Sequence, residues 1–187
     1  MSRTRIVVLA SGNGSNLQAI VDACAAGALE AEVVAVVSDQ PQARALDRAA
    51  SAGVPGVHVV RRNGEQRDAY DARLADIVSA FSPDLVVLAG WMRILTMAFL
   101  GWFPDMVVNL HPALPGELPG VDAIQRALDE ARAGRRAVTG VTVHLVPDAG
   151  ASTVSVMLAS RDGRPVPDLD AVRDAWVSTL NQLGRPD

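Results

Sequence analysis

The sequence lacks a second cysteine, an excess of positive charge and a long apolar segment near its start. The single cysteine, Cys24, cannot form an internal disulfide, and its place in the apolar stretch 20–24 predicts a buried structural thiol rather than a reactive one. The formal net charge of -4 gives no basic surface for nucleic acid or for an anionic membrane. The apolar stretch behind the basic start ends at Ala10 in a glycine-rich turn, too short for a signal or transmembrane segment. We therefore expect a cytoplasmic protein with no nucleic-acid partner and no membrane partner.

Lysine is absent too, since all 17 cations are arginines, which we interpret as a compositional bias with little bearing on chemistry. Apolar residues, in contrast, are plentiful: 49% of the 187 residues are hydrophobic, enough to bury a substantial core. No internal repeat or low-complexity linker divides the sequence. We expect a single domain over residues 1–187.

Short runs of β-branched residues alternate with longer amphipathic stretches. Strands are predicted at 6–10, 33–37, 57–60, 85–89, 106–110 and 141–146, several of them apolar on both faces. Helices are predicted at 15–26, 42–52, 65–81 and 122–133, with a candidate last helix at 168–183. This alternation predicts an α/β fold, an open and mainly parallel sheet covered by helices on both faces.

A glycine-containing loop from Ser11 to Leu17 joins the first strand to the first helix. Its two glycines allow a tight turn, and the helix amino terminus offers unpaired amides and a positive dipole end to a phosphate. Asp39 lies past the second strand, where the ribose-binding acid of a dinucleotide site could be. Because Leu17 replaces the third glycine of that fingerprint, a monophosphate fits better than a pyrophosphate. The alternative without a ligand is a plain glycine turn with Ser15 as the helix cap.

Two further segments follow strands. Segment 89–95 places an aromatic residue, a methionine and two aliphatic residues around one arginine. This composition suits a binding slot for a flat heterocycle, although a core strand that runs into a helix has the same composition. Asn109-Leu110-His111-Pro112 places an amide and an imidazole two residues apart at the carboxyl end of a strand, where open α/β sheets carry their chemistry. An amide that polarises a carbonyl, beside an imidazole that moves a proton, suits acyl transfer to an amine.

The other two histidines lie inside predicted strands. His58 and His144 are flanked by aliphatic residues, as structural histidines often are, and this interpretation fits His58 better than His144. The three histidines are scattered, and no cysteine or carboxylate cluster joins them at ligand spacing. We therefore predict no metal site.

Four segments taken together resemble the glycinamide ribonucleotide formyltransferases, the folate-dependent formyltransferase family of purine biosynthesis. They are 11–20 (SGNGSNLQAI), 89–95 (AGWMRIL), 109–112 (NLHP) and 140–144 (GVTVH), in order and with compatible spacing. The resemblance runs from Arg5 to about Val146 and implies a Rossmann-like sheet. It also implies transfer of a formyl group from 10-formyltetrahydrofolate, as co-substrate, to the amine of glycinamide ribonucleotide. The implied partners are small molecules, without a metal, in a monomer or homodimer.

The resemblance also implies roles for individual residues. Asn109 and His111 would be catalytic, Asn109 by polarising the formyl oxygen in the tetrahedral intermediate and His111 by moving protons. The substrate phosphate would bind Gly14, Ser15 and Asn16. The folate would be bordered by Met92, Arg93, Ile94 and Leu95, with Arg93 and Arg67 near its carboxylate tail.

Beyond Val146 the sequence departs from the family pattern. The family continues with an acidic loop and the motif Asp-x-Gly-Pro, whose aspartate is catalytic. The best alignment of this chain places Ser152 at the position of that aspartate, and Asp148 is the only nearby acid. Segment 114–117 departs as well, and the tail has no glutamate after Asp170. Loss of the acid from the best-studied triad of another class costs roughly 10⁴ in rate. We therefore expect residues 1–146 to be family-like, 147–187 to be divergent, and formyl transfer to be impaired.

Two alternatives stay open. A hydrolase would release formate from 10-formyltetrahydrofolate with the same Asn109 and His111, although the phosphate loop favours the nucleotide. A non-catalytic relative would bind folate or nucleotide without turnover. His144, Asp148 and Ser152 are therefore candidates for either a site role or a structural role.

Overall fold

The computed structural model describes residues 2–114, 117–118, 123–137, 139–146 and 155–159, the last five by their backbone alone. Its helices are α1 (Ser15–Ala25), α2 (Arg44–Ser51), α3 (Arg67–Ser79), α4 (Met97–Leu100) and α5 (Ala123–Arg132). Its strands are β1 (Thr4–Leu9), β2 (Ala31–Ser38), β3 (Gly56–His58), β4 (Leu85–Leu88), β5 (Val107–His111), β6 (Gly140–Leu145) and β7 (Ser155–Ala159). No helix in this part of the chain is both long and apolar enough to cross a membrane.

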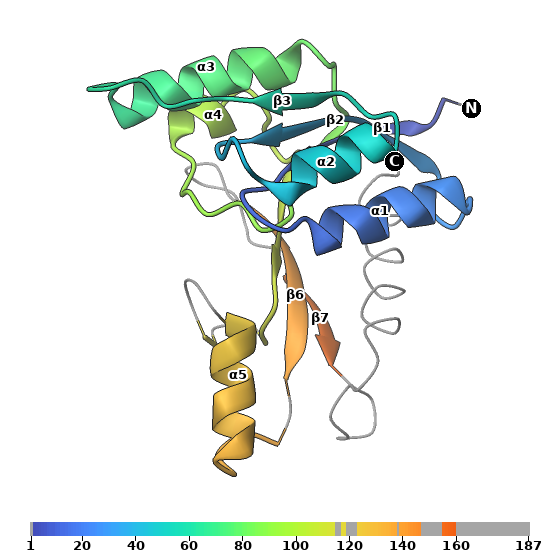
Figure 1. Ribbon diagram of the computed structural model, residues 1–187, viewed down its shortest axis with the longest axis vertical. Coiled ribbons are helices and arrows are strands. Elements are labelled where there is room, and N and C mark those ends of the chain that lie inside the picture. Colours follow the sequence, from blue (N-terminus) through green and yellow to red (C-terminus); the bar gives the residue numbers. More distant parts are fainter. Residues whose placement is uncertain (1, 115–116, 119–122, 138, 147–154, 160–187) are drawn as a thin grey trace.

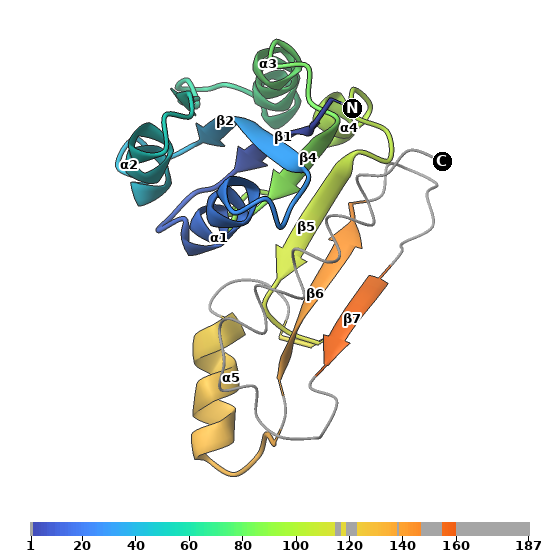
Figure 2. The same cartoon turned by 90° about the vertical axis from the view of Figure 1, so that its right-hand side faces the viewer.

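The strands form one sheet in the order β3-β2-β1-β4-β5-β6-β7 (Figures 1 and 2). Strands β1 to β5 run parallel, whereas β6 pairs antiparallel with β5, and β7 pairs antiparallel with β6. The central strand is apolar on both faces, since Val7, Val8 and Leu9 are completely buried. One core cluster lies between the sheet and α1 and α2, and the other lies between the sheet and α3 and α4. The predicted mainly parallel sheet with helices on both faces is confirmed.

Each strand predicted from the sequence is present, and so is each helix predicted before residue 134, with ends that differ by a few residues. Two elements have no counterpart among the predictions. Helix α4 is only four residues long, between Thr96 and Gly101, too short to show helical periodicity. Strand β7 lies beyond Val146, where the family resemblance ends. The candidate helix at 168–183 lies outside the described residues.

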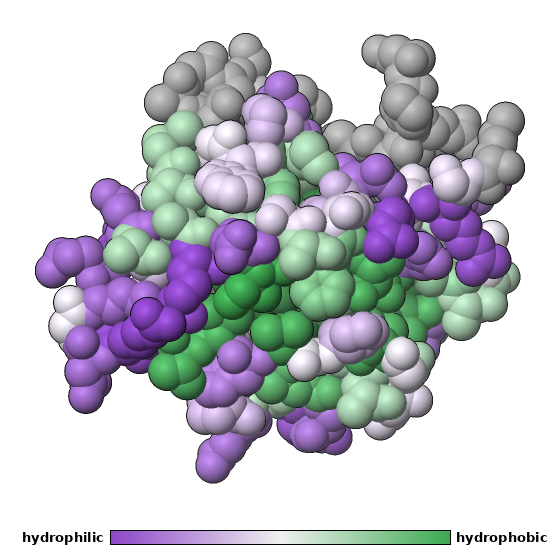
Figure 3. All heavy atoms as spheres, turned by 90° about the horizontal axis from the view of Figure 1, so that it is seen from above, coloured by the Kyte–Doolittle hydropathy of each residue, from purple (hydrophilic) through white to green (hydrophobic). Residues whose placement is uncertain are grey.

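One end of the sheet reaches beyond the helices that cover its centre. In Figures 1 and 2, β6, β7 and α5 extend away from the body formed by β1 to β4 and their helices. Seen from above (Figure 3), the molecule shows apolar side chains near the middle of the face and hydrophilic ones around them. The extension has a small apolar cluster of its own, made of Ala113, Leu118, Ala123 and Ala127. The segment that follows β5 therefore packs on α5 rather than on the body.

Cys24 allows a test of the predicted unreactive thiol. It lies on α1, is half-buried rather than fully buried, and packs against the core cluster on the α1 side of the sheet. Burial raises the pKa of the Cys24 thiol to about 11, so the reactive thiolate is scarce at neutral pH. We expect alkylation of the native protein at pH 8 to be much slower than that of free glutathione, and to accelerate until about pH 11. Alkylation at the rate of glutathione would contradict the burial of this thiol.

Candidate active site

The loops that follow β1 and β4 meet at one edge of the sheet, beside the end of β5. Since β1, β4 and β5 are neighbouring parallel strands, their carboxyl ends lie together. Two hydrogen bonds join the loops directly. The Ser11 amide donates to the Gly90 carbonyl at 3.0 Å, and the Met92 amide donates to the Ser11 hydroxyl at 3.0 Å. The fold thus brings together the three segments that the sequence analysis selected.

Gly14 caps α1 in a left-handed backbone conformation, with φ of 70°. Ser15 is therefore the first helical residue, and the alternative in which Ser15 caps the helix is wrong. A Cβ at position 14 would lie 2.8 Å from the Cα of Ala45. Glycine is therefore required at this position for two reasons, the left-handed backbone angle and the close approach of α2. The Gln18 amide bonds to the Gly14 carbonyl at 2.9 Å, and the amides before it, those of Ser15 and Asn16 included, have no intrahelical acceptor. These amides can bind an anion.

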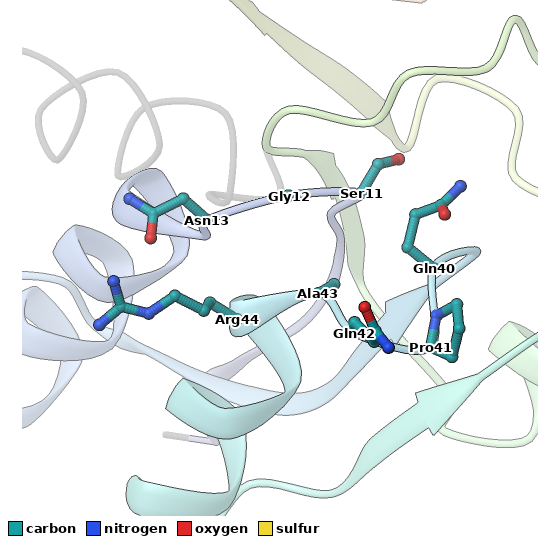
Figure 4. Close-up of a pocket in the computed structure, with 8 residues that line it drawn as sticks. All are labelled: Ser11, Gly12, Asn13, Gln40, Pro41, Gln42, Ala43 and Arg44. Atoms are coloured by element: carbon teal, nitrogen blue, oxygen red, sulfur yellow. The ribbon is translucent and has the colours of Figure 1, made fainter.

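A pocket of about 480 Å³ lies between this loop and the start of α2 (Figure 4). It is lined by Ser11, Gly12, Asn13, Gln40, Pro41, Gln42, Ala43 and Arg44, none of which is acidic. Arg44 is exposed, and its side chain has no hydrogen bond or ion pair within the described part of the chain. Its cationic group can therefore meet an anionic ligand. Sequence reasoning missed this second wall, because nothing in 40–44 shows that α2 folds back onto the glycine loop.

Helix α2 also supports the glycine loop through hydrogen bonds. Arg48 donates from Nε to the Asn13 carbonyl at 2.8 Å and from Nη1 to the Gln18 side chain at 3.0 Å. The Ala45 amide donates to the Gly12 carbonyl at 3.1 Å. The shape of the loop therefore depends on the position of α2.

Asp39 and Arg93 interact with each other beside this pocket. The Asp39 side chain is 4% exposed, and its Oδ2 lies 3.8 Å from Nη1 of Arg93 and accepts a hydrogen bond from Gln40 at 3.1 Å. The Arg93 guanidinium lies over the Tyr70 ring, 4.7 Å from its centroid. An acid buried against an arginine is not presented to a ribose, so the arrangement gives no support to a dinucleotide site.

The loop after β4 has a buried half and an exposed half. Trp91 and Leu95 belong to the core, whereas Met92 and Ile94 are 63% and 78% exposed. Arg67 at the start of α3 fixes the exposed half, because its Nε and Nη2 both donate to the Ile94 carbonyl, at 3.2 and 2.5 Å. Trp91 and Leu95 are therefore core residues, whereas the side chains of Met92 and Ile94 face solvent.

Asn109 is held by a histidine from the next strand. The antiparallel register pairs Asn109 of β5 with His144 of β6, and Asn109 Nδ2 lies 3.1 Å from His144 Nε2. His144 Nδ1 lies 3.0 Å from the Leu145 carbonyl, which accepts only, so Nδ1 carries the proton and Nε2 accepts from Asn109. The structure thus places His144 against Asn109, a contact that the sequence could not indicate without the strand register.

His111 lies on the same face of β5 as Asn109, two residues further along. Its Nε2 lies 3.0 Å from the backbone carbonyl of Glu117, so this nitrogen is protonated and donates. No hydrogen bond or ion pair joins His111 to a carboxylate among the residues that the structure describes. Asp148 and Ser152 lie outside those residues, and their predicted roles stay predictions.

His58 is separate from these groups. It lies on β3, four strands away from β5 in the sheet, and its Nε2 is buried without a hydrogen-bond partner in the described residues. Those residues contain no group of three histidine, cysteine or acidic side chains placed to hold a metal ion. Of the polar side chains on β5 and β6, those of Asn109, His111 and His144 are half-buried, whereas that of Thr142 is buried and donates to the Ala113 carbonyl.

Comparisons with known proteins find one family. The sequence profile of the formyl transferase family matches residues 4–152. The chain is 41% identical over 143 residues to the phosphoribosylglycinamide formyltransferase of Escherichia coli, and the match spans 76% of this chain and 66% of the length of that protein. Identity to the enzyme of the same description from Mycobacterium tuberculosis is 45% over 166 residues, spanning 89% of this chain and 72% of that one. The crystal structure of phosphoribosylglycinamide formyltransferase from Brucella melitensis matches with a TM-score of 0.80 at 30% identity, over 99% of this chain and 97% of that one.

The contact between Gly14 and Ala45 predicts different effects of alanine at two neighbouring glycines. Gly14→Ala should lower the free energy of unfolding by about 1–3 kcal/mol, because the left-handed backbone is unfavourable for alanine and the added Cβ meets α2. Gly12→Ala is the matched control, since a Cβ there meets nothing within 4 Å, and its effect should stay within about 0.5 kcal/mol. Urea unfolding of the parent and both variants measures the difference. Equal effects would contradict the packing of α2 on the loop.

Proposed function

We propose that this chain, which belongs to the formyl transferase family, transfers a formyl group from 10-formyltetrahydrofolate to the amine of glycinamide ribonucleotide. The observation that carries the proposal is the position of Asn109 and His111 on one face of β5, beside two loops with complementary properties. One loop offers free amides to a phosphate, and the other exposes apolar side chains to a flat ring. A transfer between a phosphorylated amine and a folate needs these features at one edge of the sheet.

Formyl transfer forms a bond from the amine nitrogen to the formyl carbon and breaks the bond from that carbon to the folate nitrogen. A proton must leave the amine and another must reach the folate nitrogen, while negative charge develops on the formyl oxygen. Asn109 Nδ2 carries two hydrogens, of which His144 accepts one, and we assign the other to the formyl oxygen. His111 would exchange its proton through Nδ1, because Nε2 is bound to the Glu117 carbonyl.

The phosphate of the ribonucleotide would bind at the start of α1. Gly14, Ser15 and Asn16 would supply backbone amides there, with the Ser15 hydroxyl as a further donor. Arg44, which was not among the predicted site residues, would add a full positive charge from the neighbouring pocket, which Ser11, Gly12 and Asn13 line on the loop side. Amides orient a phosphate, whereas the guanidinium supplies the charge that a neutral loop lacks.

The folate would lie along the exposed half of the β4 loop. Met92 to Leu95 would border its ring system, chiefly through Met92, Ile94 and the loop backbone. The Arg93 side chain is engaged by Asp39 and Tyr70, so we assign the carboxylate tail of the folate to Arg67 instead. Arg67 uses Nε and Nη2 on the Ile94 carbonyl, and its third nitrogen, Nη1, remains for that carboxylate.

The experiment that tests the function is transfer of an isotope-labelled formyl group with the purified protein. The label should move from 10-formyltetrahydrofolate to glycinamide ribonucleotide, and the transfer should require both substrates. Formate released at the same rate without the ribonucleotide would instead indicate a hydrolase. Binding of both ligands by calorimetry without movement of the label would indicate a non-catalytic relative. Either of these results would reject the proposed function.

Substitution of the two central polar groups should separate chemistry from folding. Asn109→Ala should reduce kcat by roughly 10²-fold or more through loss of the donor to the formyl oxygen, and His111→Ala by a comparable factor through loss of proton transfer. Gln125→Ala, at an exposed position of α5, serves as the control and should keep the parent rate. Thermal unfolding of each variant checks the fold. Activity within a few-fold of the parent in both substituted proteins would place the chemistry elsewhere.

The predicted absence of an acid can be tested at two positions. If Ser152 stands where the family has its aspartate, Ser152→Asp should raise formyl transfer modestly, because a carboxylate beside His111 stabilises the imidazolium that forms during proton transfer. If Asp148 already supplies that charge, Asp148→Asn should abolish activity and Ser152→Asp should add nothing. Steady-state rates of the parent and both variants, measured side by side, decide between the two. An active parent that is indifferent to both changes would contradict both.

A further inference from the structure

The segment that follows His111 is fixed against α5 by packing and hydrogen bonds. The Ala113 carbonyl accepts a hydrogen bond from the buried Thr142 hydroxyl of β6 at 2.7 Å. Leu118 is buried in the small apolar cluster with Ala123 and Ala127 of α5. Leu118 also has a positive φ of 45°, a conformation that a leucine keeps only where its surroundings impose it. Glu117, whose carbonyl binds His111, therefore lies in a segment that α5 and β6 hold in place.

Arg136 adds an ionic contact to this segment. It follows α5 in the sequence, and its Nη1 donates to the Glu117 carboxylate at 2.5 Å while its Nε donates to the Glu130 carboxylate at 2.7 Å. The Arg136 side chain is 14% exposed, much less than a typical surface arginine. A partly buried arginine that bridges two carboxylates fixes a loop more firmly than an exposed pair does.

The Arg136 contact and the His111 contact meet at the same residue. Glu117 gives its carboxylate to Arg136 and its backbone carbonyl to His111 Nε2. Since His111 has no carboxylate partner among the described residues, this carbonyl is the group that sets which ring nitrogen carries the proton. Movement of residue 117 would release the ring and let both neutral tautomers form.

We infer that the Arg136–Glu117 ion pair positions the imidazole of His111, by holding the Glu117 carbonyl where it accepts the Nε2 proton. Arg136 and Glu117 are then positioning residues that act through His111 and touch neither substrate. The kinetic consequence rests on the proposed function, because it requires that His111 take part in turnover. The expected change in the protonation of the His111 ring does not rest on the proposed function, since the ring has a defined tautomer without substrate.

The test compares five variants with the parent, namely four single substitutions and the double variant that combines Arg136→Ala with Glu117→Ala. Arg136→Ala removes the cation, Glu117→Ala removes the carboxylate but keeps the backbone carbonyl, and Arg136→Lys keeps the charge. Arg132→Ala is the matched control, because Arg132, the last residue of α5, forms an ion pair with Asp129 at 3.7 Å in which both side chains are more than half exposed. Nitrogen-15 NMR of the histidine ring identifies the protonated nitrogen of His111, and steady-state kinetics separate kcat from KM.

We expect the parent and Arg132→Ala to show a protonated Nε2 on His111 and the same rate. Arg136→Ala and Glu117→Ala should each give mixed tautomers and reduce kcat by roughly tenfold, with KM for both substrates little changed, and Arg136→Lys should recover part of the loss. The double variant should be no worse than either single one, because both remove the same contact. Glu117→Ala keeps the test decisive if Arg136→Ala unfolds.

An unchanged His111 ring signal in both Arg136→Ala and Glu117→Ala would overturn the inference, and so would an equal effect of Arg132→Ala. The proposed function can fail separately. If the ring signal changes as expected while the parent transfers no formyl group, the positioning contact is supported and the proposed reaction is rejected.

Discussion

The candidate site depends on the register between β5 and β6. Opposed residues of an antiparallel pair share a face of the sheet, so the pairing of Asn109 with His144 places both on the face that carries His111. A slip of one residue would turn each side chain of β5 to the other face. Val108 and Leu110 oppose such a slip, because both are buried in the core cluster on the α1 side. Apolar packing on one face of β5 therefore fixes the polar groups on the other.

Close packing fixes the glycine loop in a similar way. Helix α2 reaches the loop only because Gly14 has no side chain, and the Ala45 backbone occupies the space that a Cβ would take. That approach lets Arg48 hold the Asn13 carbonyl and puts Arg44 on the pocket wall. The cations beside the loop thus come from a helix whose position the glycine itself permits.

Periodicity was sufficient to predict most of the strands and helices, because each long element carries its own apolar pattern. It could not predict contacts that depend on how elements meet. The wall that carries Arg44 requires the docking of α2, and the contact of His144 with Asn109 requires a strand register. The Glu117 carbonyl has no sequence signal, since any residue has a carbonyl. Residue type could not decide the helix cap either: Ser15, the cap in the alternative without a ligand, is a usual cap residue by type, whereas the left-handed Gly14 fills that position.

An acid partner contributes both orientation and negative charge to a catalytic imidazole. In this chain a backbone carbonyl orients His111 without supplying a negative charge. In the serine protease triad, exchange of the aspartate for asparagine costs roughly 10⁴ in rate mainly because the wrong tautomer forms. In this chain the Glu117 carbonyl accepts from His111 Nε2 and fixes one tautomer, so on the proposed mechanism a serine at position 152 would not carry that penalty. A carbonyl cannot supply the negative charge that stabilises an imidazolium, and the proposed mechanism would still need that charge from another group. A carboxylate restored near His111 would act on the charge, whereas loss of the Arg136 contact would act on the tautomer. Because both changes act on one ring, their effects on the rate should be coupled rather than additive, and a double-mutant cycle measures that coupling.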